Sequence, residues 1–147
     1  MSKKILLTVV MILSAVFSFA QSVTWNFTTK TLSNGNIEIY FNATIPQGYR
    51  LYSPNNPSGA SQPLKINLEE SQDYSRISKI IEVQKPEEHY NPTFKVTEKF
   101  FTKKASFKVI ITPSTDNFTI TGDIKGQACT EAGSCTMVRK KFSIDVE

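Results

Sequence analysis

Apolar and polar residues alternate one by one through most of the chain, and this period of two constrains the fold more than any other feature. Successive side chains of a β-strand point to opposite faces, so the alternation predicts strands that each bury one face. The longest run places Ile, Ile, Phe, Ala and Ile at alternate positions from residue 37 to residue 45. Similar runs begin at Val23, Phe107, Phe118 and Phe142, and residues 64–68, 77–83 and 94–101 are further candidate strands.

Turn signals separate these candidate strands, and no segment of more than ten residues has a clean helical period. Asn34 and Gly35 suit a tight hairpin turn, because both tolerate the positive φ that such turns require. Residues 46–48 and 113–117 are further turns, and residues 53–63, with three prolines and a glycine, are predicted to be a loop. Many short strands between frequent turns indicate an all-β fold, an immunoglobulin-like antiparallel β-sandwich.

The N-terminus has the pattern of a secretory signal peptide. Lys3 and Lys4 precede an apolar stretch over residues 5–16, and Ser18 and Ala20 supply small residues before a cleavage site. We expect residues 1–20 to be the signal peptide and residues 21–147 to be one mature domain. The protein would then be periplasmic or secreted, without stable membrane insertion after cleavage, since no second apolar span follows.

Charge excludes one class of partner. The formal net charge is +4, but Lys3 and Lys4 lie in the predicted signal peptide and most other lysines are scattered. The basic residues 139–141 are interpreted as the solvated end of a strand. We therefore find no footprint for binding nucleic acid.

The chain has two cysteines, Cys129 and Cys135, in the segment Cys-Thr-Glu-Ala-Gly-Ser-Cys. This is not the C-x-x-C spacing of thioredoxin folds. A strand ending near Lys125 and another beginning near Val138 would place the cysteines opposite each other across a turn, with Gly133 at the bend. A bridge there would close a small ring and stabilise the fold by only about 2 kcal/mol. It would also be accessible to another thiolate, so spacing leaves a structural and a redox role open.

The only histidine, His89, lies in residues 86–92, Pro-Glu-Glu-His-Tyr-Asn-Pro. This acidic and aromatic segment is bounded by prolines, so it is predicted to be a loop. The sequence alone leaves open whether it covers a site or lies plainly on the surface.

Three segments, in this order, resemble the N-terminal periplasmic domain of the DsbD family of transmembrane thiol–disulfide reductases. Residues 48–52, Gly-Tyr-Arg-Leu-Tyr, are similar to the family's Gly-aromatic-x-aliphatic-Tyr segment. Residues 87–91 lie where the family has its cap loop. Residues 129–135 match its C-x5-C segment, with Ala-Gly before the second cysteine. The resemblance extends over residues 23–146.

The resemblance implies an immunoglobulin-like fold and thiol–disulfide exchange. Cys135 would form the mixed disulfide with partners and Cys129 would resolve it. The site would be lined by Tyr52 with either Tyr49 or Arg50. The cap that shields the pair when no partner is docked would consist of Glu87, Glu88, His89 and Tyr90.

The partners implied are a thioredoxin-like domain or a membrane thiol reductase as electron donor, and periplasmic disulfide proteins as acceptors. No cofactor is implied. His89 stands where the family has an apolar phenylalanine, and residues 136–138 replace the usual Pro-Pro. The family's membrane domain and C-terminal thioredoxin-like domain are not expected here, so the protein would act as a stand-alone domain.

Two other hypotheses remain. The chain would be a non-catalytic secreted β-sandwich that binds another protein and carries a structural disulfide. Alternatively, Cys129, Cys135, Met137 and His89 would hold Cu(I), which favours thiolate and thioether ligands. We expect no resident metal, because one methionine and one distant histidine make an incomplete ligand set.

Overall fold

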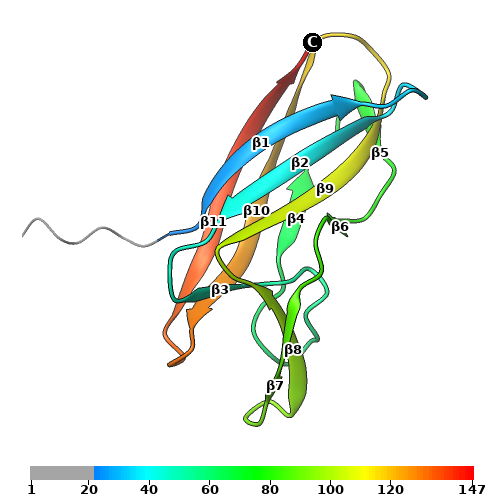
Figure 1. The fold of residues 1–147 in the computed structure, drawn as a ribbon. Helices are drawn as coiled ribbons and strands as arrows, with labels where there is room; N and C mark the ends of the chain where they lie inside the picture. Colours follow the sequence, from blue (N-terminus) through cyan, green and yellow to red (C-terminus); the bar gives the residue numbers. More distant parts are fainter. Residues whose placement is uncertain (1–21) are drawn as a thin grey trace, which may run out of the picture.

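The computed structural model describes residues 22–147, whose regular structure consists of β-strands packed as two antiparallel sheets (Figure 1). One sheet has the order β1-β2-β9-β5, with β6 also paired to β9. The other has the order β11-β10-β3-β8-β7, with β4 also paired to β10. The strands are β1 Thr24–Thr31, β2 Ile37–Thr44, β3 Tyr49–Tyr52, β4 Lys65–Leu68, β5 Tyr74–Arg76, β6 Ile81–Glu82, β7 Glu87–Asn91, β8 Val96–Phe101, β9 Lys104–Pro113, β10 Phe118–Thr130 and β11 Cys135–Val146. The predicted immunoglobulin-like β-sandwich is confirmed.

The main core lies between the two sheets and is built from alternate residues of each strand. Phe41 and Phe107 are fully buried from the first sheet, and Ile120 and Ile124 are fully buried from the second. Burying such side chains is the main favourable term in folding. The period of two in the sequence therefore corresponds to the inner faces of the sandwich.

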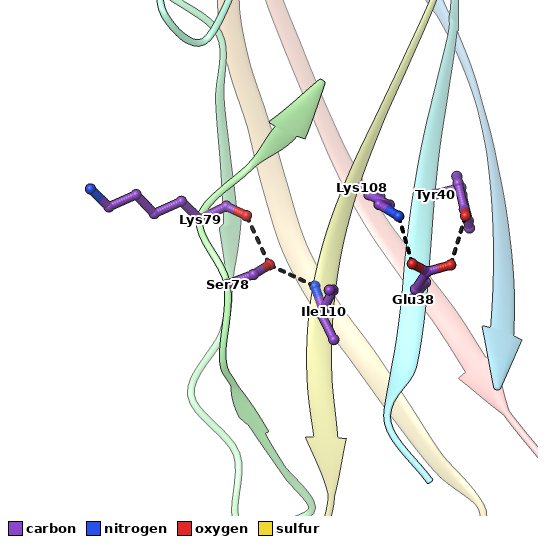
Figure 2. A network of polar contacts seen from close by, with 6 residues as sticks. All are labelled: Glu38, Tyr40, Ser78, Lys79, Lys108 and Ile110. Atoms are coloured by element: carbon purple, nitrogen blue, oxygen red, sulfur yellow. Dashed lines mark hydrogen bonds and ion pairs between the residues drawn. The ribbon is translucent and has the colours of Figure 1, made fainter. Parts of the chain in front are cut away.

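Glu38, Tyr40 and Lys108 form a hydrogen-bonded network on β2 and β9 of the first sheet (Figure 2). Lys108 Nζ donates to Glu38 Oε1 at 2.6 Å, and the hydroxyl of Tyr40 donates to Glu38 Oε2 at 2.7 Å. These two hydrogen bonds, that of Lys108 first, lower the pKa of Glu38. The carboxylate has its partners within the sheet, so this face offers no unsatisfied reactive group at Glu38.

The segment predicted as a strand over residues 77–83 pairs regularly only at β6, so this prediction was too long. The hydroxyl of Ser78 accepts the backbone N–H of Ile110 at 2.8 Å and donates to the carbonyl of Lys79 at 2.8 Å (Figure 2). A side chain thus replaces the missing backbone partner at the edge of β9, which allows the chain to leave the sheet between β5 and β6.

Strand β10 is long and pairs with three other strands of the second sheet. It pairs with β11 along its whole length, and its other edge pairs with β4 over residues 122–125 and with β3 over residues 128–130. The predicted ends near Lys125 and Val138 were wrong, because the ladder continues to Cys129 and Cys135. At residue 126, which faces the core, the chain has glycine because a Cβ there would lie 3.1 Å from Leu64. The alternation of apolar residues is therefore interrupted at Gly126, although the strand continues.

Strands β7 and β8 form a hairpin that extends from the same end of the sandwich as the β10–β11 turn (Figure 1). The predicted loop over residues 86–92 is therefore wrong, since Glu87–Asn91 is a strand. β7 pairs only with β8 and is mostly exposed, so it lacks the apolar alternation by which strands are recognised.

The signal peptide predicted over residues 1–20 lies outside the described residues. Within residues 22–147, no helix has the length and apolar character needed to cross a membrane.

Candidate functional site

The two cysteines form a disulfide at the last pair of the β10–β11 ladder. Cys129 and Cys135 are directly opposite each other, with their Cα atoms 4.0 Å apart. The turn between them is closed by backbone hydrogen bonds between Thr130 and Ser134 at 2.8 Å and from Gly133 to Thr130 at 3.0 Å. Gly133 has φ +90°, in the left-handed region that favours glycine. The predicted bend at Gly133 is confirmed.

The two half-cystines differ sharply in exposure. Cys129 is 3% exposed and packs with Tyr52 and Phe100 in a small apolar cluster separate from the main core. The rings of Tyr52 and Phe100 lie edge to face with centroids 6.4 Å apart. Cys135 is exposed at the start of β11. An incoming thiolate therefore has direct access to only one of the two residues.

The strand register decides which neighbours share the face of the disulfide. Opposite residues of an antiparallel pair project to the same side, and Cys129 is opposite Arg50. Tyr52, two residues on, lies on the same outer face as Arg50. Tyr49 is opposite Thr130 and packs against the main core instead. Of the two alternatives from the sequence, Arg50 rather than Tyr49 therefore faces the pair.

Arg50 brings a positive charge beside the buried cysteine. Its guanidinium lies 4.5 Å from the centroid of the Phe100 ring, a cation–π contact. Its Nη2 lies 3.5 Å from Glu131 Oε1, whose side chain is 87% exposed in the turn. An ion pair with an exposed partner of this kind is weak, and the charge of Arg50 also acts on the buried carboxylate of Glu98.

A cleft of about 630 Å³ opens on this face and is lined by both cysteines. Among the residues predicted for the site, Arg50, Tyr52 and His89 also line it. Tyr49, Glu87, Glu88 and Tyr90 do not line this cleft.

The predicted cap residues follow the alternation of β7. Glu87 accepts a hydrogen bond from the Thr102 hydroxyl at 2.6 Å, and Glu88 lies 3.9 Å from Lys99 Nζ. Tyr90 is 57% exposed. Only His89 of the four reaches the cleft. Glu88 and Tyr90 project to the opposite face of β7, and Glu87, on the same face as His89, is paired with Thr102 instead.

The sequence analysis missed Phe94, which lies in the turn of the β7–β8 hairpin, lines the cleft and is 47% exposed. Phe94 was placed at the start of the candidate strand over residues 94–101, but that strand begins at Val96 and Phe94 precedes it in the turn. Phe94, rather than His89, supplies an apolar group on the cap side of the cleft.

The second missed residue is Glu98, a carboxylate only 4% exposed on β8. Its Oε1 accepts the backbone N–H of Ser61 at 3.1 Å, and its Oε2 accepts Asn91 Nδ2 at 3.0 Å. The amide oxygen of Asn91 in turn accepts the backbone N–H groups of Thr93 at 3.0 Å and Phe94 at 3.3 Å. One buried carboxylate thus connects the loop on one side of the cleft to the hairpin turn on the other.

Glu98 is held ionised within this network. Burial by itself would raise the pKa of Glu98, but the hydrogen bonds from Asn91 and Ser61, together with the charge of Arg50, outweigh it and lower that pKa. The orientation of the Asn91 amide follows, because an ionised carboxylate only accepts hydrogen bonds.

Two residues of the copper hypothesis, Met137 and His89, line different clefts. Among residues 22–147, no three His, Cys, Asp or Glu side chains gather as a metal site. Met137 lines a separate cleft with Lys65 and Arg139, away from His89.

A family model described as "Thiol:disulfide interchange protein DsbD, N-terminal" matches residues 19–146. The chain belongs to this family. The resemblance drawn from its three motifs is confirmed, and thiol–disulfide exchange is the chemistry that membership of the DsbD N-terminal family supports.

Two solved structures share the fold of this DsbD N-terminal-like domain. The N-terminal periplasmic domain of ScsB from Proteus mirabilis matches with a TM-score of 0.59 and 17% identity over 89% of this chain and 48% of that one. The chain therefore spans about half the length of that structure. The N-terminal domain of Neisseria meningitidis DsbD in the reduced form matches with a TM-score of 0.52 and 16% identity over 89% and 90% of the two chains. No curated protein matches the chain by sequence.

Proposed function

We propose that this protein is an exported thiol–disulfide exchange domain that acts through the Cys129–Cys135 pair. It would pass reducing equivalents from a thioredoxin-like or membrane donor to periplasmic disulfide proteins. The observation that carries the proposal is the unequal exposure of the pair, with Cys135 open to the cleft and Cys129 buried behind it. Exchange requires access to one sulfur and a second thiol nearby to release the partner.

Export rests on the N-terminal pattern. Cleavage of residues 1–20 would leave residues 21–147 as the mature domain, in the periplasm or outside the cell. The Proteus mirabilis structure is described as a periplasmic domain, which agrees with that location. A disulfide between Cys129 and Cys135 also suits an oxidising compartment.

In the reductive half of the reaction, a partner thiolate attacks Sγ of Cys135. The bond between the cysteines breaks, a mixed disulfide forms at Cys135, and Cys129 leaves as a thiolate. A second partner thiol then attacks the mixed disulfide, so the partner leaves oxidised and the pair is reduced. In the second half, Cys135 attacks a client disulfide and Cys129 resolves the adduct, which returns two electrons to the client.

Arg50 is proposed to assist the departure of Cys129. A thiolate in an apolar cluster is unfavourable, because burial raises the pKa of a thiol, whereas a neighbouring cation lowers it. Arg50 is held opposite Cys129 by the β3–β10 register and by its contact with the Phe100 ring. It would therefore offset part of the cost of forming the charge.

Phe94 is proposed to shield the pair between encounters, a role that the sequence analysis had given to the position of His89. We expect Phe94→Ala to speed reduction of the disulfide by a small thiol about threefold, because a smaller side chain in the lining of the cleft would leave Cys135 more accessible. Tyr90→Ala is the matched control, because Tyr90 is a similarly exposed aromatic on the same hairpin that does not line the cleft. Stopped-flow reduction would measure both rates, and equal effects of the two variants would contradict the shielding role.

The reduction potential of the Cys129–Cys135 pair tests the function as a whole. Structural disulfides have potentials below about −300 mV, whereas exchange disulfides lie higher. We therefore expect a value above about −300 mV from equilibration with glutathione or dithiothreitol redox buffers. A lower value would favour the alternative, a non-catalytic secreted β-sandwich that binds another protein and carries a structural disulfide.

A further inference from the structure

A row of three cations crosses the outer face of the second sheet. Lys125 on β10 is directly opposite Arg139 on β11 and directly opposite Lys65 on β4. Opposite residues project to the same face, and all three side chains are exposed. We call Lys65, Lys125 and Arg139 the cationic row. The sequence analysis interpreted Arg139 as part of a solvated strand end, because the strand pairing that aligns it with the two lysines is not visible in the sequence.

The cationic row is not explained by the stability of the sheet. Like charges directly opposite each other in adjacent strands are destabilising. Lys125 has an ion pair with Asp123 at 2.8 Å, but neither Lys65 nor Arg139 has an acidic side chain within 4.0 Å in the described part of the chain. Positive charge is therefore concentrated on this face without compensation for two of the three residues.

The cationic row is continuous with the exchange site. With Met137 it lines a cleft of about 700 Å³, and Gln62 lines both this cleft and the one that holds the cysteines. Met137, which is 49% exposed, is two residues from Cys135 on the same strand. Lys125 is four residues from Cys129 along β10, which is about 13 Å at the rise of a β-strand.

A partner docked at Cys135 would reach this row. A standard interface covers about 800 Å² on each partner, equivalent to a disc of about 16 Å radius. The cationic row falls inside such a disc centred on the disulfide, with the apolar Met137 between the two. Charges at this distance act at the rim of an interface, where they govern the association rate and its dependence on salt.

We propose that the cationic row is a docking surface for an acidic region beside the reactive cysteine or disulfide of the redox partner. The inference rests on the proposed function and names the chemistry of the partner surface. A protein surface is the occupant favoured by the geometry, because the row, Met137 and the disulfide lie on one face within one standard footprint. Attraction would raise the encounter rate with acidic partners and disfavour basic ones.

The test uses peptide probes with the reduced protein. Each peptide carries one cysteine bonded to thionitrobenzoate and is flanked by glutamates, by glutamines or by lysines, and release of the coloured thiol gives the rate. We expect the acidic peptide to react about tenfold faster than the basic one at low salt. The ratio should fall below about twofold in about 1 M salt, where the Debye length is about 3 Å.

Matched variants localise the effect. Lys65→Gln with Arg139→Gln should reduce the acidic preference about fivefold at low salt. Lys30→Gln with Lys79→Gln makes the same change in net charge at exposed positions on or beside the first sheet and should leave the preference unchanged. Equal losses in the two double variants, or no preference in the unaltered protein, would overturn the proposal.

Two further outcomes distinguish the docking surface from a failure of the exchange function and from binding to a membrane. Release from none of the peptides would contradict the proposed exchange function, and the docking surface with it. Binding to phosphatidylglycerol vesicles that is lost in Lys65→Gln with Arg139→Gln, while the peptide preference stays unchanged, would assign the row to a membrane surface and overturn a protein partner. Loss of the peptide preference in that variant alone supports the docking surface.

Discussion

Cys129→Ser is expected to accumulate a mixed disulfide with a thioredoxin-like partner, whereas Cys135→Ser is expected to accumulate about a hundredfold less. The partner is used with its second cysteine replaced by serine and its first cysteine bonded to thionitrobenzoate. In Cys129→Ser the exposed Cys135 displaces thionitrobenzoate from this partner, and neither protein then has a second thiol to release the adduct. In Cys135→Ser the remaining thiol is 3% exposed beneath Tyr52 and Phe100. Uncovering it requires displacement of a large apolar side chain at a cost of about 1.5–3 kcal/mol. Each 1.4 kcal/mol is a factor of ten in the reactive population.

Non-reducing mass spectrometry of the trapped adducts measures this difference directly. Alkylation of both variants in denaturant is the control, because each should then show one fully reactive thiol. An adduct that is at least as abundant with Cys135→Ser as with Cys129→Ser would reverse the roles proposed for the two cysteines. A double variant, Cys129→Ser with Phe100→Ala, should keep the adduct, since Phe100 covers Cys129 and not Cys135.

The strands of the main core were predictable because each buries one face only. Phe41 and Phe107 lie in runs whose alternate residues are buried, so the period of two translates directly into structure. The same logic fails for β7, which extends from the sandwich with most of its side chains exposed and therefore has no apolar period. The fold was readable wherever solvent and core lie on opposite faces of the same strand.

The cysteines were identified from the sequence, but their neighbours depend on register and on side chains from distant segments. Arg50 rather than Tyr49 faces the disulfide because side chains alternate between the two faces of β3. Leu51 is buried in the core, so its neighbours Arg50 and Tyr52 point outward. The alternation along residues 49–52 can be read from the sequence, whereas the pairing of Arg50 with Cys129 cannot. Glu98 was not predictable, since a glutamate in a mixed strand indicates exposure and its burial depends on Asn91 and Ser61.

The hydrogen bonds that connect Glu98 to the hairpin turn run in one direction, because Asn91 donates to Glu98 and accepts from the turn. Glu98→Gln keeps the size of the side chain but replaces one acceptor oxygen with a donor. If the new amide faces Asn91, Asn91 must present its oxygen to it, and its NH₂ then meets the backbone N–H groups of Thr93 and Phe94. Donor would face donor, so the turn loses its support. We expect a loss of about 2 kcal/mol in the free energy of unfolding, typical for a buried hydrogen bond to a charged group.

The rate at which the disulfide is reduced should change together with stability, because the same carboxylate also holds Ser61 on the opposite side of the cleft. We expect Glu98→Gln to speed reduction of the disulfide by a small thiol about tenfold, the factor that corresponds to about 1.4 kcal/mol of lost ordering. This exceeds the effect expected for Phe94→Ala, which leaves the loop and the turn in place. Stopped-flow reduction and urea unfolding give the two readouts, and an unchanged rate in a folded Glu98→Gln protein would contradict the link.

The pH dependence has a defined sign. The pKa of Glu98 is lower in the folded state, so the unfolded state takes up a proton first as the pH falls. The stabilisation from Glu98 is present above its unfolded pKa, about 4.3, and is lost as the pH falls through the lower folded pKa. The stability difference between the unaltered protein and Glu98→Gln should therefore shrink below about pH 4. A constant difference down to about pH 2 would mean that the ionised carboxylate is not what the network recognises.

A swap of donor and acceptor distinguishes a specific link from general damage to the hairpin. Asn91→Asp alone places a second carboxylate against Glu98 and should destabilise the turn as strongly as Glu98→Gln. Combined, the two substitutions restore complementarity, because the amide of residue 98 donates to one oxygen of Asp at position 91 and the other oxygen accepts from Thr93 and Phe94. We expect the double variant to recover most of the stability and the slow reduction rate, a coupling within the range of about 0.5–3 kcal/mol for residues in contact. Additive losses would show that the two side chains act independently, and the positioning of the hairpin turn would then have to come from its backbone alone.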